Sequence, residues 1–322
     1  MNRGIAFVGS IIHDRIYTVA EYPKIGSLAR IECIKYAVGG LVPNDSIDIK
    51  KLRKSVPVYA FGKIGADEGG RYCLEIMKDV GVDISGVKIS EKEGTGFTDV
   101  MSIEGGQRTF FSYAGANDTF GFDDIDFDSL DADMLHLGYF LLLGKVDSGD
   151  GLAILREAKR RGIKTSIDFV SCTPDKYPPF RGCLKYVDNL ILNEQEAAAL
   201  VGMDSDRSSL LDIASALLNE GVGERVIIHS PMLGVIANRN GTVTSLPSLD
   251  LPDGFIVGTA GAGDAFCSGA LLGIYEGRTD REILEYATYS AAASLRSADG
   301  TGAMDDLENI KSDLSGLSFR AG

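Results

Sequence analysis

Residues 258–266 constrain the fold of this chain more than any other stretch, because they read Gly-Thr-Ala-Gly-Ala-Gly-Asp-Ala-Phe. The apolar run 255–257 before them is expected to be an extended strand, and residues 265–275 after them a helix. The first amides of a helix have no partner within it, and the helix dipole adds partial positive charge there. A glycine turn that leads into a helix therefore predicts an anion cradle suited to phosphate.

Asp264 lies inside this cradle, where a carboxylate would repel phosphate. The conflict disappears if Asp264 accepts a proton from a hydroxyl group while nearby amides hold the phosphoryl group that this hydroxyl attacks. The alternative is an ordinary turn in which Asp264 only caps the helix. The length of the motif favours catalysis, with Asp264 as the base and Gly261, Ala262 and Gly263 as the cradle.

The charge and cysteine content limit the partners of the chain. Its 322 residues carry 46 acidic against 32 basic side chains, a net charge of −14, which argues against nucleic acid or an anionic membrane as a partner. The five cysteines show no Cys-x-x-Cys spacing, as is typical of a reduced protein. The most apolar run, 134–144, is too short to span a bilayer. A soluble, cytoplasmic protein is expected.

The order of expected strands and helices predicts an α/β fold. From residue 134 onward strands and helices alternate, which predicts a mainly parallel sheet covered by helices on both faces, a three-layer α/β/α arrangement. Short alternating fragments at 15–37, and an expected hairpin at 96–114 with its turn at 104–107, interrupt that order. These two regions are assigned to a small separate antiparallel sheet.

Residues 259–266 closely resemble the C-terminal signature of the ribokinase-like (PfkB-type) carbohydrate kinase family, and the resemblance covers nearly the whole chain. It implies a single kinase domain over 1–322 that uses ATP and Mg²⁺ to phosphorylate a sugar or nucleoside hydroxyl. It also implies that the strands at about 15–37 and 96–114 form a lid over the sugar, through which a homodimer could form. Asp264 occupies the base position of the family.

Further motifs of the family match the substrate side. Gly39, Gly40 and Asn44 resemble its N-terminal signature, in which glycine amides and an asparagine amide meet sugar hydroxyls. Asp14 matches the acidic residue that grips two sugar hydroxyls, and Asn117 lies in a Gly-Ala-Asn segment expected near the sugar. Each motif also has a plainer interpretation as a turn, a helix cap or a loop. Ile12 and Gly138 replace polar residues of ribokinases, so ribose itself is not implied.

Four residues match the nucleotide side. Asn193 and Glu196 resemble the family's Asn-x-x-Glu motif, which arranges Mg²⁺ and its water shell, and Thr259 is placed at the nucleotide. The alternative for the first two is a helix cap. Asp168 matches a position near the phosphates. Gly258 stands where many relatives have an aspartate of a monovalent-cation site, so the resemblance does not support a potassium requirement. The adenine pocket is left unassigned.

These observations predict an ATP-dependent sugar kinase that transfers the γ-phosphate to a hydroxymethyl group. Two alternatives remain open: a nucleoside kinase of the adenosine or pseudouridine type on the same fold, and a non-catalytic sugar or nucleotide sensor. The sequence contains no Gly-x-x-x-x-Gly-Lys-Ser/Thr loop and no Gly-x-Ser-x-Gly elbow, which argues against P-loop and hydrolase functions.

Overall fold

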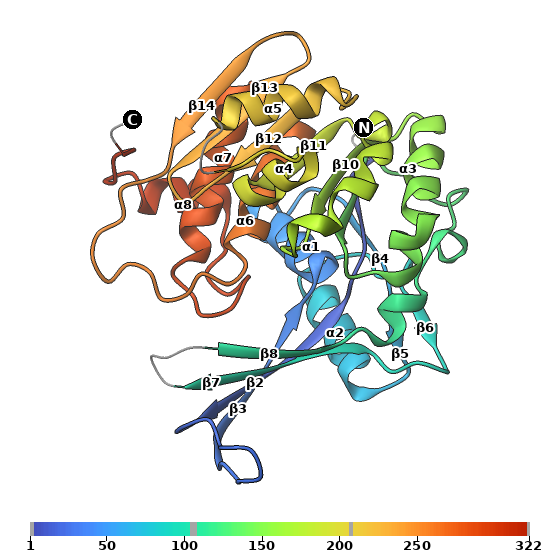
Figure 1. Cartoon of the computed structure of the whole chain (residues 1–322), viewed down its shortest axis with the longest axis vertical. Coiled ribbons are helices and arrows are strands. Elements are labelled where there is room, and N and C mark those ends of the chain that lie inside the picture. The colour runs from blue at the N-terminus through green and yellow to red at the C-terminus, as the bar shows by residue number, and fades with distance from the viewer. Residues whose placement is uncertain (1–2, 104–107, 206–208, 321–322) are drawn as a thin grey trace.

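A large, mainly parallel sheet runs through the molecule (Figure 1). The computed structural model describes residues 3–103, 108–205 and 209–320. The strands lie side by side in the order β14 (Val243–Pro247), β13 (Leu233–Asn238), β12 (Arg225–His229), β11 (Asn189–Asn193), β10 (Lys164–Phe169), β9 (Met134–Phe140), β1 (Ile5–Val8) and β4 (Val58–Phe61). From β4 to β12 every pairing is parallel, whereas the β12–β13 and β13–β14 pairings are antiparallel, so β13 alone runs against the other strands of this sheet.

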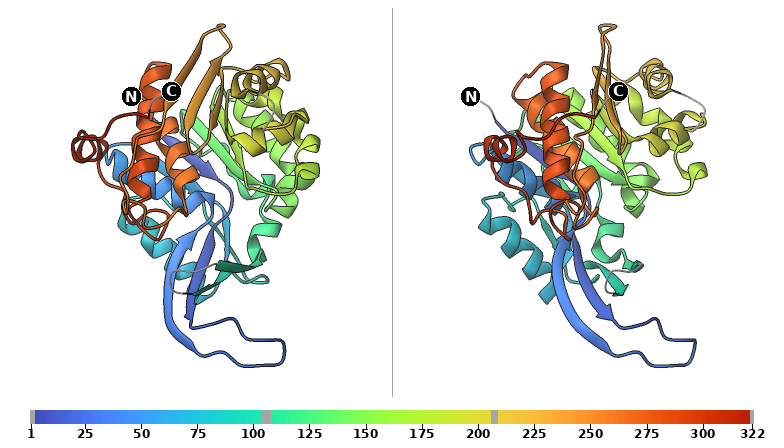
Figure 2. Two further views of the ribbon diagram at one scale, coloured as in Figure 1. Left: turned by 60° about the vertical axis from the view of Figure 1, so that its left-hand side comes forward. Right: turned by 90° about the vertical axis from the view of Figure 1, so that its left-hand side faces the viewer.

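Both faces of this sheet are buried under helices, as predicted. In β1, Ile5 and Phe7 point into one core while Ala6 and Val8 point into the other, which explains its unbroken apolar sequence. The first core is covered by α1 (Leu41–Leu52), α2 (Glu68–Asp79), α6 (Ala262–Tyr275), α7 (Asp280–Ser294) and α8 (Leu307–Asp313). The second is covered by α3 (Gly151–Arg160), α4 (Glu194–Val201) and α5 (Leu210–Asn219). Figure 2 shows the layers edge on.

A second sheet projects from the body of the molecule and forms the lid (Figure 2). Its strand order is β3 (Ile31–Gly39), β2 (Ile12–Val19), β7 (Gly96–Ile103) and β8 (Arg108–Tyr113). The β2–β3 and β7–β8 pairs are antiparallel, whereas the central β2–β7 pair is parallel. The turn expected at 104–107 lies outside the described residues. A short parallel pair, β5 (Lys63–Gly65) with β6 (Lys88–Ser90), lies beside this region.

One expectation about secondary structure was wrong, and one helix was not expected. The apolar run 255–257 forms no strand, and its Ile256 and Val257 are 52% and 63% exposed. The reason is topological: β14 ends at the sheet edge, whereas α6 packs beside α1, so the chain between them crosses the surface as a connection. The helix α8 was not predicted. None of the helices within the described ranges is long and apolar enough to cross a membrane.

Candidate active site

The turn before α6 has the conformation that its glycines predict. Gly261 is the N-cap of α6 and adopts a left-handed backbone with φ 77°. A Cβ atom at this position would also collide with the backbone of Gly300, so only glycine fits. The helix begins at Ala262, and Asp264 therefore lies in its first turn. The cradle residues and Asp264 are thus brought together as the sequence indicated.

Asp264 is buried and held by two side chains from distant elements. The Asn44 amide nitrogen, on α1, donates to Asp264 Oδ2 at 2.8 Å. The Tyr139 hydroxyl, at the end of β9, donates to Oδ1 at 2.8 Å and to Oδ2 at 2.9 Å. Burial, followed by the nearby Asp168 carboxylate, raises the pKa of Asp264 to about 7, against the opposing effect of both hydrogen bonds. The carboxyl group is therefore poised to exchange a proton near neutral pH.

A cavity of about 360 Å³ opens in front of Asp264. It lies at the carboxyl ends of the parallel strands, the position at which open α/β sheets bind ligands. Its polar lining comes from the ends of four neighbouring strands and from the turn before α6: Tyr139, Asp168, Ser171, Asn193, Glu196, His229, Gly261 and Gly263. Three residues expected at the nucleotide, Asn193, Glu196 and Asp168, thus share one cavity with the expected base.

Asn193 and Glu196 form a capping box at the start of α4. Asn193 Oδ1 accepts hydrogen bonds from the backbone of Gln195 and Glu196, and Glu196 Oε2 accepts from the Asn193 backbone at 3.2 Å. The Ser171 hydroxyl donates to Glu196 Oε1 at 3.0 Å. Burial raises the pKa of Glu196 to about 7. The cap that the sequence left open as an alternative is therefore present, and both residues still face the cavity.

The residues expected on the substrate side connect the lid to Asp264. Asp14, on β2, lies against Gly39 so closely that any side chain at position 39 would occupy the space of its carboxylate. Gly40 caps α1 with φ 83°, and Asn44 lies one turn later, where it meets Asp264. Burial raises the pKa of Asp14 to about 6. Gly39 ends β3 and Gly40 caps α1, so the chain leads directly from the lid to Asn44 at Asp264.

The structure does not bring Asn117 to the cavity of Asp264. Its side chain is buried, with Oδ1 accepting from the Ile11 backbone nitrogen and Nδ2 donating to the Ile11 carbonyl, both at 3.0 Å. In this position the Asn117 amide supports the loop after β1. A role in binding the sugar remains a prediction.

A second cavity, of about 500 Å³, adjoins the first and shares Asn193, His229 and Gly263 with it. Thr259 lies on its wall. The remaining lining is mostly apolar and includes Met232, Leu249, Leu251, Ile256, Phe266, Ala292 and Leu295. His229 stacks on Phe266 with ring centroids 4.7 Å apart, and burial lowers the pKa of His229 to about 4. Its size and apolar walls suit a flat heterocycle.

The model of the "pfkB family carbohydrate kinase" family matches residues 2–307. The chain belongs to this family. It is therefore a carbohydrate kinase, a phosphotransferase with an alcohol group as acceptor, and members of the family use ATP with Mg²⁺.

Known relatives agree with this assignment. A ribokinase of Arabidopsis thaliana is 26% identical over 317 residues, covering 98% of this chain and 81% of that protein. An adenosine kinase of Saccharomyces cerevisiae is 26% identical over 273 residues, covering 81% of this chain and 78% of that protein. The solved structure of Arabidopsis thaliana ribokinase complexed with ribose and ATP superimposes with a TM-score of 0.82 at 23% identity, covering 99% of this chain and all of that one, which confirms the fold.

Two parts of this kinase site escaped the sequence analysis. Tyr139 holds the expected base, yet it carries no motif, and its backbone has the unusual φ of 57°. Asp45 and Asp48 are completely buried on α1 beside the site, although an aspartate on a helix is normally read as a surface residue. The burial of these two aspartates could have been inferred only from the helical period of α1, which places them on the same face as its apolar residues.

Proposed function

We propose that this carbohydrate kinase transfers the γ-phosphate of ATP to a hydroxymethyl group of a sugar, with Asp264 as general base. The observation that carries the proposal is the position of Asp264: a buried carboxylate in the first turn of α6, facing a cavity. Burial raises its pKa to about 7, and a general base is most effective when its pKa lies near the working pH.

The acceptor hydroxyl gives its proton to Asp264 as its oxygen attacks the γ-phosphorus, and ADP leaves with the electrons of the broken P–O bond. In the structure the Tyr139 hydroxyl contacts both carboxylate oxygens of Asp264, and the Asn44 amide donates to one of them. The acceptor hydroxyl therefore replaces the Tyr139 hydroxyl at the carboxylate. Amides at the start of α6, at Ala262, Gly263 and Asp264, stabilise the charge that develops on the phosphoryl group.

Asp14, Gly39, Gly40 and Asn44 are proposed to hold the sugar. Asp14 offers a carboxylate beside Gly39, and Asn44 offers an amide that already contacts Asp264, so a sugar held by both would place its hydroxymethyl group near the base. The Asn117 side chain, paired at both ends with Ile11, would act on the sugar only by holding that loop.

The second cavity is proposed to hold the adenine ring, with Thr259 on its wall and the phosphates reaching past Gly263 into the first cavity. Asn193 and Glu196 line the cavity, and their side-chain oxygens already accept hydrogen bonds from the protein. They therefore fit Mg²⁺ that is held through its water shell, since such an ion needs no direct bond to them. There the ion would neutralise phosphate charge. Asp168 adds a third oxygen-bearing side chain on the same wall.

A nucleoside is the second candidate acceptor, favoured by the similarity to the yeast adenosine kinase. The base and the phosphate cradle would serve it unchanged, because both acceptors present a hydroxymethyl group. The two candidate acceptors differ in size on the lid side of the site, because a nucleoside carries a base in addition to its sugar.

A homodimer through the lid is also proposed. One face of the lid exposes apolar side chains, among them Ile34, Tyr36 and Phe111, and exposed sheet edges invite pairing. Phe111→Asp should shift the protein from dimer to monomer in light scattering. A wild-type protein that is already monomeric would exclude this assembly.

The function is tested by Mg²⁺-dependent release of ADP from ATP across a panel of sugars and nucleosides. Acceptor-dependent release that is lost in Asp264→Asn is the expected result, and the active acceptor then separates sugar from nucleoside kinase. ATP binding with no phosphorylated product from any acceptor would instead favour a sensor.

A further inference from the structure

Four buried side chains with metal-binding chemistry meet beneath Asp264. They are Asp45 on α1, His136 on β9, Asp168 on β10 and Cys267 on α6. One donor atom from each lies within 4.8 Å of the donors of the others. His136 Nε2 is 3.7 Å from Asp45 Oδ2, 3.7 Å from Asp168 Oδ2 and 3.7 Å from Cys267 Sγ. Four separate elements therefore converge on one point.

The other polar atoms of three of these side chains are held by hydrogen bonds. His136 Nδ1 lies 2.8 Å from the Ser166 hydroxyl. Asp45 Oδ1 accepts from the Ser268 hydroxyl at 2.8 Å, and Asp168 Oδ1 accepts from the Tyr139 backbone at 2.7 Å. Such contacts orient the remaining donor of each side chain, as the outer partners of metal ligands do.

Asp45 Oδ2 points into this cluster without a hydrogen bond. The side chain is fully buried, and no donor within the described ranges pairs with this oxygen. His136 is the sole ion-pair partner of Asp45 and of Asp168 among the described residues. A buried carboxylate without compensation is costly, so the cluster calls for positive charge at its centre.

The donor set selects the kind of ion. Mg²⁺ and Ca²⁺ prefer oxygen ligands, whereas an imidazole nitrogen, a thiolate and carboxylates together suit Zn²⁺ and neighbouring transition metals. Tetrahedral Zn²⁺ with its usual bond lengths holds its donor atoms about 3.3–3.6 Å apart. The three separations from His136 Nε2, each 3.7 Å, exceed that range by a few tenths of an ångström, and all separations among the four donor atoms are within 4.8 Å, so the site would contract on binding.

We propose that Asp45, His136, Asp168 and Cys267 form a closed, structural site for a Zn²⁺-class ion. Binding releases the thiol proton of Cys267 to solvent and uses His136 with Nε2 unprotonated. Asp168 and Cys267 also line the cavity in front of Asp264, which gives the ion a way in. Asp45 is next to Asn44, and Cys267 is one turn from Asp264, so the ion anchors the base and its partner relative to the sheet. The site uses neither Asn193 nor Glu196, the two residues proposed to bind Mg²⁺, although Asp168 lies on the wall of the same cavity.

The test uses the full chain, stripped with a chelator and reloaded with Zn²⁺ or Co²⁺ in the presence of excess Mg²⁺. One Zn²⁺ per chain by elemental analysis is expected, together with a thiolate-to-cobalt charge-transfer band in the Co²⁺ form. Cys267→Ala should lose the band and bind metal at least tenfold more weakly. Cys183→Ala, which removes a buried cysteine in the other core, and Glu196→Gln should keep both properties.

A Co²⁺-loaded wild-type protein without the thiolate band would overturn the proposal even if no variant folds. Metal uptake that is equal in wild type and Cys267→Ala would do the same. In either case the four side chains would form no metal site. Ser166→Ala provides a milder variant, since loss of the His136 contact should weaken Zn²⁺ binding without removing a ligand.

Discussion

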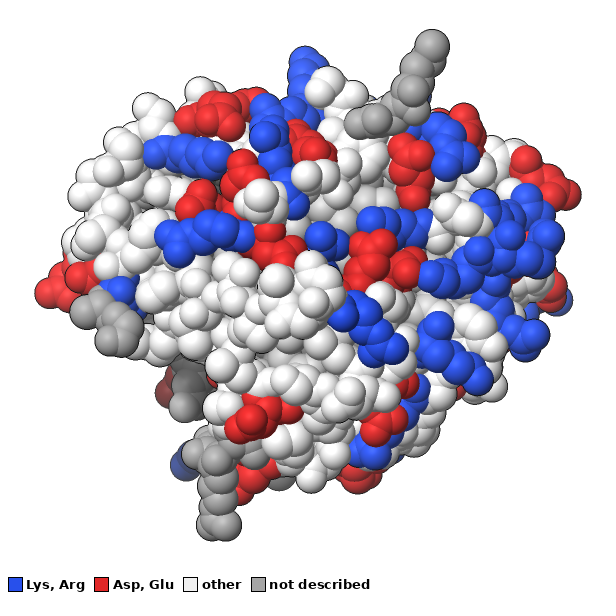
Figure 3. All heavy atoms as spheres, turned by 90° about the horizontal axis from the view of Figure 1, so that it is seen from above, with Lys and Arg blue, Asp and Glu red and all other residues white. Residues whose placement is uncertain are grey.

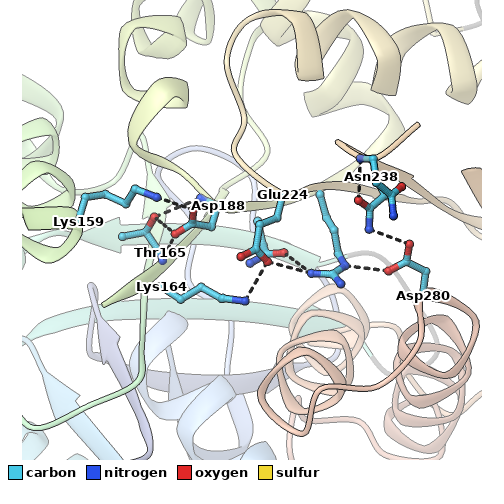
Figure 4. A network of polar contacts seen from close by, with 10 residues as sticks. Lys159, Lys164, Thr165, Asp188, Glu224, Asn238 and Asp280 are labelled. Atoms are coloured by element: carbon cyan, nitrogen blue, oxygen red, sulfur yellow. Dashed lines mark hydrogen bonds and ion pairs between the residues drawn. The ribbon is translucent and has the colours of Figure 1, made fainter. Parts of the chain in front are cut away.

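The two ends of the central sheet differ in whether their acidic side chains have cationic partners. At the amino ends of the strands every acid in the network of Figure 4 has a cationic or amide partner. Asp188 pairs with Lys159 and accepts from Thr165, and Glu224 pairs with Lys164 and Arg225. Asp280 accepts from Arg225 at 2.8 Å and from Asn238 at 3.0 Å. The surface on this side shows basic and acidic side chains interspersed (Figure 3).

At the carboxyl ends the buried acids lack lysine and arginine partners among the described residues. Asp45, Asp48, Asp168 and Asp264 are all buried, and within the part of the chain that the structure describes none forms an ion pair with lysine or arginine. Both oxygens of Asp48 lack a hydrogen bond among these residues. The amino end therefore uses charge to join strands and helices, whereas the carboxyl end keeps carboxylates available for protons, cations and substrate.

Replacing an acid at each end should separate these roles most clearly. Asp264→Asn should lower turnover by roughly two or more orders of magnitude, because the amide accepts no proton, while ATP affinity stays close to wild type. Asp280→Asn is the matched control and should leave turnover within about twofold. Steady-state kinetics and ATP titration of both variants provide the measurement. Equal turnover in Asp264→Asn and wild type would show that Asp264 is not the general base.

Asp48→Asn should change how stability depends on pH. Burial, and then the Asp264 carboxylate, raise the pKa of Asp48 well above its ordinary value, so the folded state binds this proton more tightly than the unfolded chain. Wild-type stability therefore falls as pH rises between the unfolded and folded pKa values, by up to about 1.4 kcal/mol per pH unit, and Asp48→Asn lacks this loss. Urea unfolding at several pH values measures the two slopes, and parallel slopes would contradict the prediction.

Asp280→Asn should cost stability at the other end. Its carboxylate is mostly buried and joins α7 to β12 through Arg225, so the substitution leaves the guanidinium underpaired. A loss of about 1–3 kcal/mol in unfolding free energy is expected. Denaturant titration at neutral pH provides the value. A neutral result would mean that Glu224 alone satisfies Arg225.

The pH profile should show the smallest effect and refine the comparison. Since burial raises the pKa of Asp264 to about 7, kcat/KM should fall as pH drops below that value and the base becomes protonated. The Tyr139 hydrogen bond lowers this pKa, so Tyr139→Phe should move the midpoint upward, by on the order of one pH unit. A midpoint that stays in place would show that the Tyr139 hydrogen bond does not lower the pKa of Asp264 in the free enzyme.

Sequence reasoning recovered the parts of the site that are carried by local motifs. The Gly261 turn, Asp264 and the Asn193–Glu196 pair each depend on a few consecutive residues whose backbone chemistry is nearly independent of context. The strand expected at 255–257 failed for the opposite reason. An apolar run becomes a strand only if a neighbouring strand is within reach, and the connection to α6 offers none.

The sequence by itself determined the α/β class, the family and the position of the expected base, because periodicity and the Gly-Ala-Gly-Asp turn are local properties. Only the tertiary structure decided which side chains surround that base. Asn44, Tyr139 and Asp45 lie far from Asp264 along the chain and meet it, or the cluster beneath it, only when α1 and α6 pack on β9 and β10. The burial that raises the pKa of Asp264 comes from the same packing, so no stretch of sequence contains it.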